Sequence, residues 1–474
     1  MSKLLLKNID VIATMDDKLS EKKDCDILID GSEIKLIQPD IQLEEEVRTI
    51  DGKGKIAFPG FVNVHHHMYQ IYTRDLPRIL GAKDLFDWLR LNYLIWGYLD
   101  EEMIYYSALV GLSSLLKTGC TLVSDLHYII PATENNGLID AEIQAAKELG
   151  VRFHPTRGSV SILDSKDALA PRGVSQSDEE ILLDYERLVN TYHDPNPFSM
   201  LRIALAPVNP VTATESLLLE TIKFARKYNL HCHTHLAESP QENEWSMINH
   251  GMREFDYMES IGWVGPDVWY AHCLHLTDDE IRRFGKYHTG VAHCPVCNAK
   301  NGVIAPIHKM LDAGANIGFG VDGMGGFGDM VAELRTAVVL HAYRQASENN
   351  ELRMGPDLAR DVLSIATKGG ARVLGWDEIG TLEVGKAADI VLFDLDRFDF
   401  AGNVTDLVTS FAYYGSNHFV DVSIVNGKVL IEDGELKGID EKAITHKVNE
   451  LSMEYVKRIT KETGIDYTVA RIDD

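Results

Sequence analysis

Eight short apolar runs, separated by amphipathic stretches long enough for helices, occupy the middle of the chain. The runs are IAFPGFVNV, CTLVSD, VRFHPT, MLRIALAPV, LHCHTH, DVWYAH, TGVAHC and ANIGFGVD. Alternation of this kind is typical of parallel sheets covered by helices. Eight repeats between Phe61 and Asp322 predict an α/β fold, a (β/α)8 TIM barrel, in which chemistry lies at the C-terminal ends of the strands.

Both ends of the chain show a different pattern. Segments such as CDILIDGSEIKLI near the start and VSIVNGKVLIEDGEL near the end combine short strands with Asp-Gly or Asn-Gly turn signals. Strands from the two ends can complete one sheet, so we expect a small β-sandwich domain formed by both termini. The expected divisions are 1–58 and 376–440 for the small β domain, 59–375 for the metal-dependent barrel and 441–474 for a C-terminal helix.

Length and charge restrict the classes of partner. The chain has 474 residues, of which 45% are hydrophobic, enough for a large core and more than one domain. With 72 acidic against 46 basic residues, the net charge of −26 argues against nucleic acid as a partner. The start, MSKLLLKNIDVIATMDD, contains only a short Leu run, unlike a signal peptide or a membrane span. We therefore expect a cytoplasmic protein with no membrane partner.

The six cysteines do not suggest a disulfide framework in a chain of this length. Cys294 and Cys297 form a CPVC motif that suits redox chemistry or zinc binding. A structural zinc site of this type needs a second CxxC pair. A redox-active CxxC motif is usually found at the start of a helix near the beginning of the chain. Neither interpretation is favoured, and the role of the two residues stays open.

Four candidate metal ligands fall at the ends of predicted barrel strands. His65 and His67 close the first run, His235 closes the fifth and Asp322 closes the eighth. Residues two apart on a strand point to the same side, so His65 and His67 can face one ion while His66 faces away. The pattern therefore predicts one shared site at the mouth of the barrel.

Imidazoles and one carboxylate suit one divalent metal per chain, with Zn²⁺ first and Fe²⁺ as the alternative. Such an ion lowers the pKa of a bound water to roughly 7, which supplies hydroxide at neutral pH. Hydrolysis also needs a proton carrier, and Glu238 lies three residues beyond His235. A lone histidine at a strand end is more often a hydrogen-bonded core residue than a ligand. Four such placements together favour a catalytic metal centre.

Further histidines lie near the same strand ends. His272 closes the sixth run, and His293, in VAHCPVCN, is expected to line the pocket and contact substrate. We interpret His154, His231 and His233 as structural, because not all of these side chains can bind one ion.

The motifs FPGFVNVHHHMYQ, HPTRGSVS, HCHTHLAES, GPDVWYAH, TGVAHCP and GFGVDG resemble those of the amidohydrolase superfamily. The similarity covers nearly the whole chain and is strongest to the aminohydrolase branch of 8-oxoguanine deaminases and hydroxyatrazine ethylaminohydrolases. The resemblance implies hydrolytic deamination of an amino-substituted N-heterocycle, with ammonia released after attack by a water activated on the metal. The residues it assigns to the metal are His65, His67, His235 and Asp322.

The same resemblance implies roles for the catalytic groups. Glu238 matches the general acid/base and protonates the ring nitrogen next to the amino-bearing carbon. His272 contacts the attacking water and the scissile centre, and Asp322 accepts the proton of that water. Gln70 matches a glutamine that similar guanine-type deaminases use to hydrogen-bond the purine, and an amide suits a lactam edge.

The sequence leaves the heterocycle open. Arg157, at the end of the third run, can offer two donors to a ring carbonyl, or form a surface salt bridge. The aromatic stretch from Tyr69 to Trp96 suits either a lid or core packing. Where similar 8-oxoguanine deaminases read AHCPSSN, this chain reads AHCPVCN. The expected order is 8-oxoguanine or a related oxidised purine, then a pterin such as isoxanthopterin, then a hydroxytriazine.

Two other classes remain as alternatives. Cyclic-amide or other C–N hydrolases with two metals commonly use a carboxylated lysine at the end of the fourth strand, but that run ends ALAPVNP. A catalytically inactive metal-binding barrel would tolerate loss of Glu238 and His272, and both are present. The expected partner is a small heterocyclic substrate, and assembly into a homo-oligomer stays open.

Overall fold

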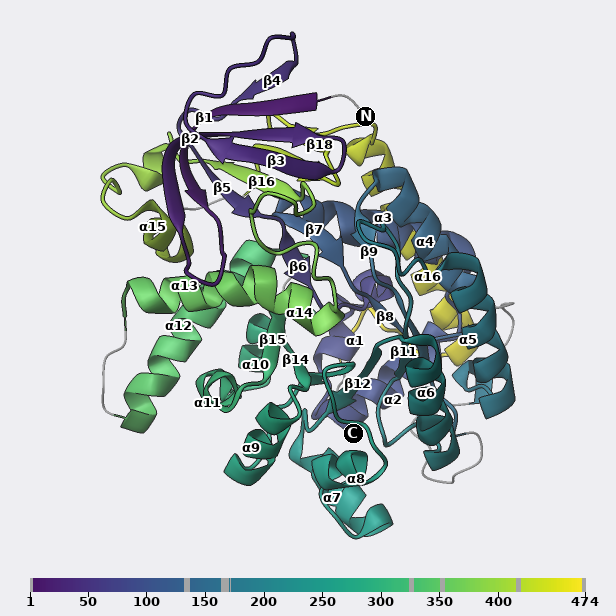
Figure 1. Ribbon diagram of the computed structural model, residues 1–474. Helices are drawn as coiled ribbons and strands as arrows, with labels where there is room; N and C mark the ends of the chain where they lie inside the picture. The colour runs from purple at the N-terminus through teal and green to yellow at the C-terminus, as the bar shows by residue number, and fades with distance from the viewer. Residues whose placement is uncertain are drawn as a thin grey trace.

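The computed structural model describes residues 3–131, 137–162, 170, 172–323, 328–349, 354–414 and 419–470. In Figure 1 the purple N-terminal strands and the light-green C-terminal strands form one sheet, which lies beside a barrel built from the middle of the chain. This arrangement confirms the predicted TIM barrel with a small β domain formed by both termini. The domain bounds given above stay a prediction.

The barrel is a ring of parallel strands. β15 pairs with β6, β6 with β7, and the order continues through β9 and β10 to β14. Two strand positions are interrupted, so that β7 with β8 and β9 with β10 each fill one place in the ring. The described strands therefore fill eight places. They are β6 (Phe61–Asn63), β7 (Cys120–Val123), β8 (Leu126–His127), β9 (Arg152–Phe153), β10 (Thr156–Ser159), β11 (Ala204–Pro207), β12 (Cys232–Leu236), β13 (Val268–His272), β14 (Gly290–His293) and β15 (Asn316–Phe319).

Helices follow the barrel strands and cover the outside of the ring (Figure 1). The helices up to β15 are α1 (Pro77–Leu80), α2 (Leu85–Trp96), α3 (Glu101–Lys117), α4 (Leu138–Leu149), α5 (Asp178–Tyr192), α6 (Glu215–Tyr228), α7 (Pro240–His250), α8 (Glu254–Ser260), α9 (Asp278–Lys286), α10 (Pro295–Lys300) and α11 (Ile307–Ala313). Those after β15 are α12 (Met330–Asn349), α13 (Pro356–Ser364), α14 (Gly370–Leu374), α15 (Leu407–Tyr413) and α16 (Glu441–Thr463). Shorter helical turns are η1 (Met68–Tyr72), η2 (Arg172–Val174), η3 (Ile365–Gly369) and η4 (Phe398–Phe400). None of the described helices is both long enough and apolar enough to cross a membrane.

The small domain is a nine-stranded sheet in which the C-terminal strands form one side, the N-terminal strands form the other, and the two sets meet where β16 pairs with β5. β5 pairs in parallel with β1 and antiparallel with β16. Its members are β1 (Lys3–Ala13), β2 (Glu21–Asp30), β3 (Glu33–Gln38), β4 (Arg48–Asp51), β5 (Lys55–Pro59), β16 (Ile390–Asp394), β17 (Val422–Val425), β18 (Lys428–Glu432) and β19 (Glu435–Leu436). An apolar cluster with members from β1, β2, β16 and β17 forms its core.

The first apolar run of the sequence serves both domains. β5 ends at Pro59 in the small sheet, and β6 begins at Phe61 in the barrel. Gly60 joins them, and a Cβ atom there would lie 2.0 Å from the Thr121 hydroxyl oxygen. The close packing of the two sheets at this point therefore requires glycine.

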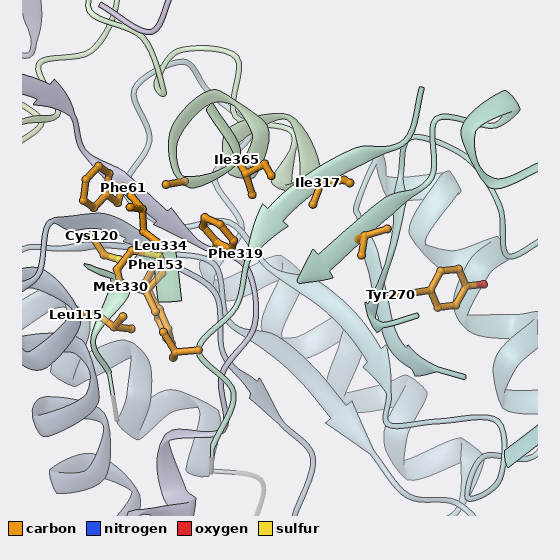
Figure 2. Close-up of a cluster of buried hydrophobic side chains, with 14 of the residues drawn as sticks. Phe61, Leu115, Cys120, Phe153, Tyr270, Ile317, Phe319, Met330, Leu334 and Ile365 are labelled. Atoms are coloured by element: carbon orange, nitrogen blue, oxygen red, sulfur yellow. The ribbon is translucent and has the colours of Figure 1, made fainter. Parts of the chain in front are cut away.

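The main apolar core lies between the barrel strands and the helices around them. Figure 2 shows part of it, with Phe61 and Phe319 from barrel strands beside Met330 and Leu334 from α12. Phe61, Phe319, Met330 and Leu334 are all fully buried. Burial of this much apolar surface holds the strands in register and fixes the positions of their C-terminal ends.

The aromatic stretch that could have formed a lid packs instead as a second core. Tyr69, Tyr93 and Trp96 are each 1% exposed or less and belong to a cluster with residues of α16. Tyr455 of α16 donates a hydrogen bond from its hydroxyl to the Ile95 carbonyl at 2.9 Å. The core interpretation of this stretch therefore agrees with the structure.

Candidate active site

Three histidines that lie far apart in the sequence meet at one end of the barrel. His235 is part of β12, whereas His65 and His67 follow β6, which ends at Asn63. The expectation that a strand extends through His65 and His67 is therefore not met. Their rings nevertheless lie with centroids 4.7 Å apart, and the His235 ring lies 5.0 Å from His65 and 5.3 Å from His67.

The Nδ1 atoms of two of these rings are bound by backbone carbonyls. His67 Nδ1 lies 2.7 Å from the Leu126 carbonyl oxygen, and His235 Nδ1 lies 2.7 Å from that of Val208. A carbonyl can only accept, so Nδ1 carries the hydrogen in both rings. Each neutral ring then has its lone pair on Nε2, and the two Nε2 atoms face each other at 3.3 Å.

The ring of the third histidine, His65, is oriented by a hydrogen bond to His233, which is itself held by a backbone carbonyl. His233 Nδ1 lies 2.9 Å from the Trp269 carbonyl oxygen and therefore donates to it. His233 Nε2 is then an acceptor, and it lies 2.8 Å from His65 Nδ1, which donates to it. The lone pair of His65 is thereby placed on Nε2, a buried atom that has no hydrogen-bond partner. A ring nitrogen held by a carbonyl or another acceptor is the usual environment of a metal-binding histidine.

Electrostatics keeps these imidazoles neutral. Burial, followed by the neighbouring histidines, lowers the pKa of His65 and of His235 well below the usual value. Burial also lowers the pKa of His67, although the Asp322 carboxylate opposes that shift. The unprotonated Nε2 atoms of the three rings thus face a common buried space. The nitrogens of these three rings lie within 4.8 Å of one another, so the donor set fits a divalent cation.

Asp322 supplies a carboxylate beside the three rings. It lies just beyond β15, and its Oδ1 is 3.5 Å from His67 Nε2 and 3.7 Å from His65 Nε2. Burial alone would raise the pKa of Asp322, but the adjacent His67 and His272 hold it below the usual range. The carboxyl group is therefore ionised and contributes a negative donor to the site.

His272 lies beside the Asp322 carboxylate of this donor set and beside Glu238. His272 ends β13, and its Nε2 lies 3.6 Å from Glu238 Oε2 and 3.9 Å from Asp322 Oδ2. Burial raises the pKa of Glu238. The pKa of His272 is raised as well, because the Glu238 and Asp322 carboxylates outweigh the effect of burial. The pair can hold and transfer a proton above the usual range of a carboxylic acid.

Gln70 presents a buried amide without partners beside Asp322. The residue is 1% exposed, and neither Oε1 nor Nε2 has a hydrogen-bond partner. The Tyr69 hydroxyl is also buried without a hydrogen-bond partner. A Cβ atom on Gly323 would lie 2.0 Å from Gln70 Oε1, so the amide packs against the backbone that follows Asp322. A buried amide without hydrogen-bond partners lowers the stability of the fold unless a bound ligand supplies those partners.

Arg157 and His293 have protein partners. Arg157 is fully buried, and its guanidinium donates to Asp184 at 2.7 Å, to Gln176 at 2.7 Å and to the Gly158 carbonyl at 2.5 Å. The alternative of a surface salt bridge does not hold, because the ion pair with Asp184 is buried. The roles of both residues in substrate binding stay predictions.

His293 ends β14 and lies beside α12. Its Nε2 lies 3.1 Å from His341 Nε2, and its Nδ1 is buried without a partner. Burial and the neighbouring His341 lower the pKa of His293 well below the usual value.

Two residues near the site were not assigned a role from the sequence. His233, interpreted as structural, orients His65; its even spacing from His235 on the strand was the available signal. Cys297, in the CPVC motif, lies with its sulfur within 4.8 Å of ligand atoms of Glu238 and His272. Only the position of that motif directly after β14 pointed to this neighbourhood.

Comparisons with known proteins agree with this geometry. The Amidohydrolase family model matches residues 56–430. The hydroxydechloroatrazine ethylaminohydrolase of Pseudomonas sp. strain ADP is 36% identical over 429 residues, which cover 88% of each chain. The 8-oxoguanine deaminase of Pseudomonas aeruginosa is 36% identical over 397 residues, which cover 83% of this chain and 86% of the relative. The crystal structure of atrazine chlorohydrolase from Arthrobacter aurescens TC1 with zinc aligns with a TM-score of 0.88 at 31% identity, covering 95% of this chain and 100% of that one.

Proposed function

Because this chain belongs to the amidohydrolase family, we propose that it hydrolytically removes the amino group of an N-heterocycle and releases ammonia. The first candidate substrate is 8-oxoguanine or a related oxidised purine. The observation that carries the proposal is the convergence of three neutral imidazole Nε2 atoms and one ionised carboxylate beside a buried glutamate.

We assign the metal site to His65, His67, His235 and Asp322, with one divalent ion per chain and Zn²⁺ as the first candidate before Fe²⁺. The orphaned Nε2 of His65 and the facing Nε2 atoms of His67 and His235 support this assignment. When bound, the ion supplies a nucleophilic water at neutral pH by lowering the pKa of that water to roughly 7.

Glu238 is the proposed general acid. Burial favours its neutral form, so it can hold a proton at a pH at which an exposed glutamate has lost it. Its carboxyl group donates that proton to the ring nitrogen beside the amino-bearing carbon. The carbon thereby becomes more electrophilic, and the negative charge that develops on the ring is neutralised.

His272 and Asp322 complete the proton transfers. Asp322 is ionised, and its Oδ2 can accept a proton from the attacking water. His272 lies between the two carboxylates and, in the proposed reaction, donates a hydrogen bond to the oxygen that adds to the ring. The proton taken up by Asp322 passes to the amino group, which leaves as ammonia. The hydroxyl proton that remains returns to Glu238, and the product carries a carbonyl group.

Substrate recognition is assigned first to Gln70. Its unpaired amide offers one acceptor and two donors, which suit the adjacent C=O and N–H of a lactam edge. A site that leaves such a group unpaired disfavours a ring without a lactam. Arg157 and His293 are proposed to shape the pocket wall on the neighbouring strands.

The runner-up substrates are a pterin such as isoxanthopterin and a hydroxytriazine. A hydroxytriazine is supported by the 36% identity to hydroxydechloroatrazine ethylaminohydrolase, which equals the identity to 8-oxoguanine deaminase. Pterins and oxidised purines share the lactam edge that the Gln70 amide complements. A cytoplasmic location and homo-oligomerisation stay predictions.

The test is a screen of metal-replete protein for release of ammonia or alkylamine. The panel contains guanine, 8-oxoguanine, isoxanthopterin, isocytosine and aminated hydroxytriazines. We expect the highest kcat/KM on 8-oxoguanine, with the Glu238→Gln protein as the blank. Higher efficiency on a triazine would reverse the order of substrates, and no release from any ring would refute deamination.

A further inference from the structure

Three chemically different donors meet beside the proposed metal site. Glu238 follows β12, His272 ends β13 and Cys297 lies in α10. A carboxylate oxygen, a ring nitrogen and a thiol sulfur from these residues all lie within 4.8 Å of one another. Side chains from three separate elements therefore enclose one small space.

The separation of the nitrogen and oxygen donors of the cluster suits a tetrahedral ion. His272 Nδ1 lies 3.1 Å from Asn298 Oδ1, so the amide oxygen accepts from Nδ1, and Nε2 is the ring nitrogen left to bind an ion. That Nε2 lies 3.6 Å from Glu238 Oε2, too far for a hydrogen bond. Ligand atoms about 2.0 to 2.3 Å from a tetrahedral zinc ion are about 3.3 to 3.7 Å apart. The observed separation falls within that range.

The cluster is distinct from the proposed catalytic metal site. That site uses His65, His67, His235 and Asp322, none of which belongs to the cluster. His272 is 1% exposed and Cys297 is 7% exposed. Glu238 is partly exposed. The cluster adjoins the catalytic site, because His272 Nε2 lies 3.9 Å from Asp322 Oδ2 and His272 also lies within ligand distance of His65 and Asp322.

We propose that Glu238, His272 and Cys297 form a second cation site, which takes a thiophilic divalent ion such as Zn²⁺ or Cd²⁺ and whose occupation inhibits the enzyme. A thiolate, an imidazole and a carboxylate form a set that soft and borderline ions prefer, whereas Mg²⁺ and Ca²⁺ prefer oxygen ligands. On binding, metal bonds form to the Cys297 sulfur, the His272 Nε2 and a Glu238 oxygen, and the thiol proton together with any proton carried by Glu238 or by His272 Nε2 is released to solvent. A water molecule completes the tetrahedron.

Inhibition rests on the proposed function, but binding does not. An ion held by Glu238 takes the carboxylate oxygen that would otherwise carry a proton to the substrate. It also occupies Nε2 of His272, which would otherwise donate a hydrogen bond to the oxygen that adds to the ring. The bound ion therefore removes two groups of the proposed mechanism without displacing the catalytic metal.

The experiment titrates Cd²⁺ into protein already loaded with one equivalent of Zn²⁺. Cadmium bound to a thiolate gives an ultraviolet charge-transfer band, whereas cadmium bound to histidine and carboxylate does not. We expect one further equivalent to bind wild-type protein with appearance of the band. Cys297→Ser removes the band and weakens binding about tenfold or more. Cys294→Ser is the matched control, because Cys294 lies in the same motif but outside the cluster, and it retains both.

Turnover measured in the same titration separates the two parts of the proposal. We expect loss of ammonia release to follow the band in wild type and in Cys294→Ser. Cys297→Ala serves as a second variant, and a thermal melt of each variant verifies folding. A band that persists in both folded Cys297 variants overturns the site. A band that forms in wild type without loss of turnover overturns the inhibition, and it removes Glu238 from the mechanism while leaving the metal site intact.

Discussion

At the scale of single residues, the protonation of Glu238 is the step on which the proposed turnover depends. Glu238→Gln keeps the size of the side chain and its ability to donate a hydrogen bond, but an amide cannot transfer a proton. We expect kcat to fall by about 10² to 10⁴, while the metal content per chain stays equal to that of wild type. Steady-state kinetics and elemental analysis on one preparation measure both. Turnover at the wild-type rate would exclude Glu238 as the general acid.

His233 acts on the site through another residue and is therefore a positioning residue. Its Nε2 accepts from His65 Nδ1, and its Nδ1 donates to the Trp269 carbonyl. His233→Ala removes the acceptor that fixes the ring of His65. We expect metal affinity to fall by about 10- to 100-fold, measured by competition with a chromophoric chelator, with activity regained at high metal concentration.

His231, two residues before His233, provides a control for that substitution. His231 precedes β12, and its ring packs near Gly375, away from the site. His231→Ala also removes an imidazole, but it leaves the partner of His65 in place. Metal affinity close to wild type is expected. Equal losses in the two variants would mean that general loosening of the strand, rather than orientation of His65, explains the effect.

The proximity of the four proposed ligands could be predicted because the C-terminal ends of parallel barrel strands must meet. This rule brought His65, His67, His235 and Asp322 together from the positions of apolar runs alone. The role of His233 could not be predicted, since it depends on pairing of His233 with Trp269 across β12 and β13. That register sets which carbonyl reaches the ring, and no local pattern encodes it.

At the scale of elements, a buried carboxyl pair braces the turn that carries His67. Asp125 precedes β8, and its Oδ1 accepts from the Met68 backbone N–H at 2.8 Å. Glu142 of α4 lies with Oε1 2.8 Å from His127 Nδ1. Burial raises the pKa of Asp125 and of Glu142 well above the usual values. The loop after β6, β8 and α4 are thereby joined through side chains.

The hydrogen-bond partners of the His127 ring determine the protonation states of His127 and Glu142. His127 Nε2 lies 2.8 Å from the Ile129 carbonyl oxygen, so it carries the hydrogen of the neutral ring. Burial lowers the pKa of His127 to about 4, which leaves Nδ1 as an acceptor at neutral pH. Glu142 must then donate to Nδ1 and is protonated. Its ionisation is easier in the unfolded chain than in the fold.

A protonated Glu142 predicts a pH effect for the Glu142→Gln variant. Because the folded pKa of Glu142 lies above the unfolded value, its ionisation favours the unfolded state as pH rises above about 4.3. The glutamine keeps a donor for His127 and cannot ionise. We therefore expect the variant to lose less free energy of unfolding than wild type between pH 5 and pH 8, by about 1 kcal/mol or more. Urea unfolding at the two pH values measures the difference.

The control on the same helix is Glu148→Gln. Glu148 is exposed and accepts a hydrogen bond from the Tyr105 hydroxyl, so its replacement changes one charge on α4 without touching the buried cluster. We expect its pH dependence to match that of wild type. A Glu142→Gln protein with the same pH dependence as this control would contradict the protonated state of Glu142.

Strand positions were predictable from apolar runs, but two details of the elements were not. The third run contains Pro155, which has no N–H for a ladder and separates β9 from β10. The first run was counted among the barrel strands, although the expected domain bounds placed its residues up to 58 in the small domain. The structure divides the run at Gly60. Hydrophobic patterning alone cannot give that position, because both halves are buried and apolar.

At the scale of the whole molecule, strands from opposite ends of the chain close the fold. β5 pairs with β16 over five residue pairs, from Lys55 with Asp394 to Pro59 with Ile390. Arg152, beside β7, joins this sheet to the barrel through a buried ion pair with Asp389 at 2.8 Å. The two sheets therefore do not form separately packed units at this point, although the sequence alone indicated only that the two ends share a domain.

The convergence of neutral imidazoles predicts that the metal stabilises the entire barrel. His65, His67 and His235 come from opposite sides of the ring, and they meet only in the folded state. A ligand bound only by the folded state adds about 2.7 kcal/mol at a free concentration 100 times its dissociation constant. We expect chelation to lower the Tm and one equivalent of Zn²⁺ to restore it. His235→Asn, which removes one ligand from β12, shows a much smaller shift under the same conditions. If chelator and zinc leave the Tm of wild type unchanged while elemental analysis shows the metal leaving and returning, these three rings do not share an ion in the folded protein.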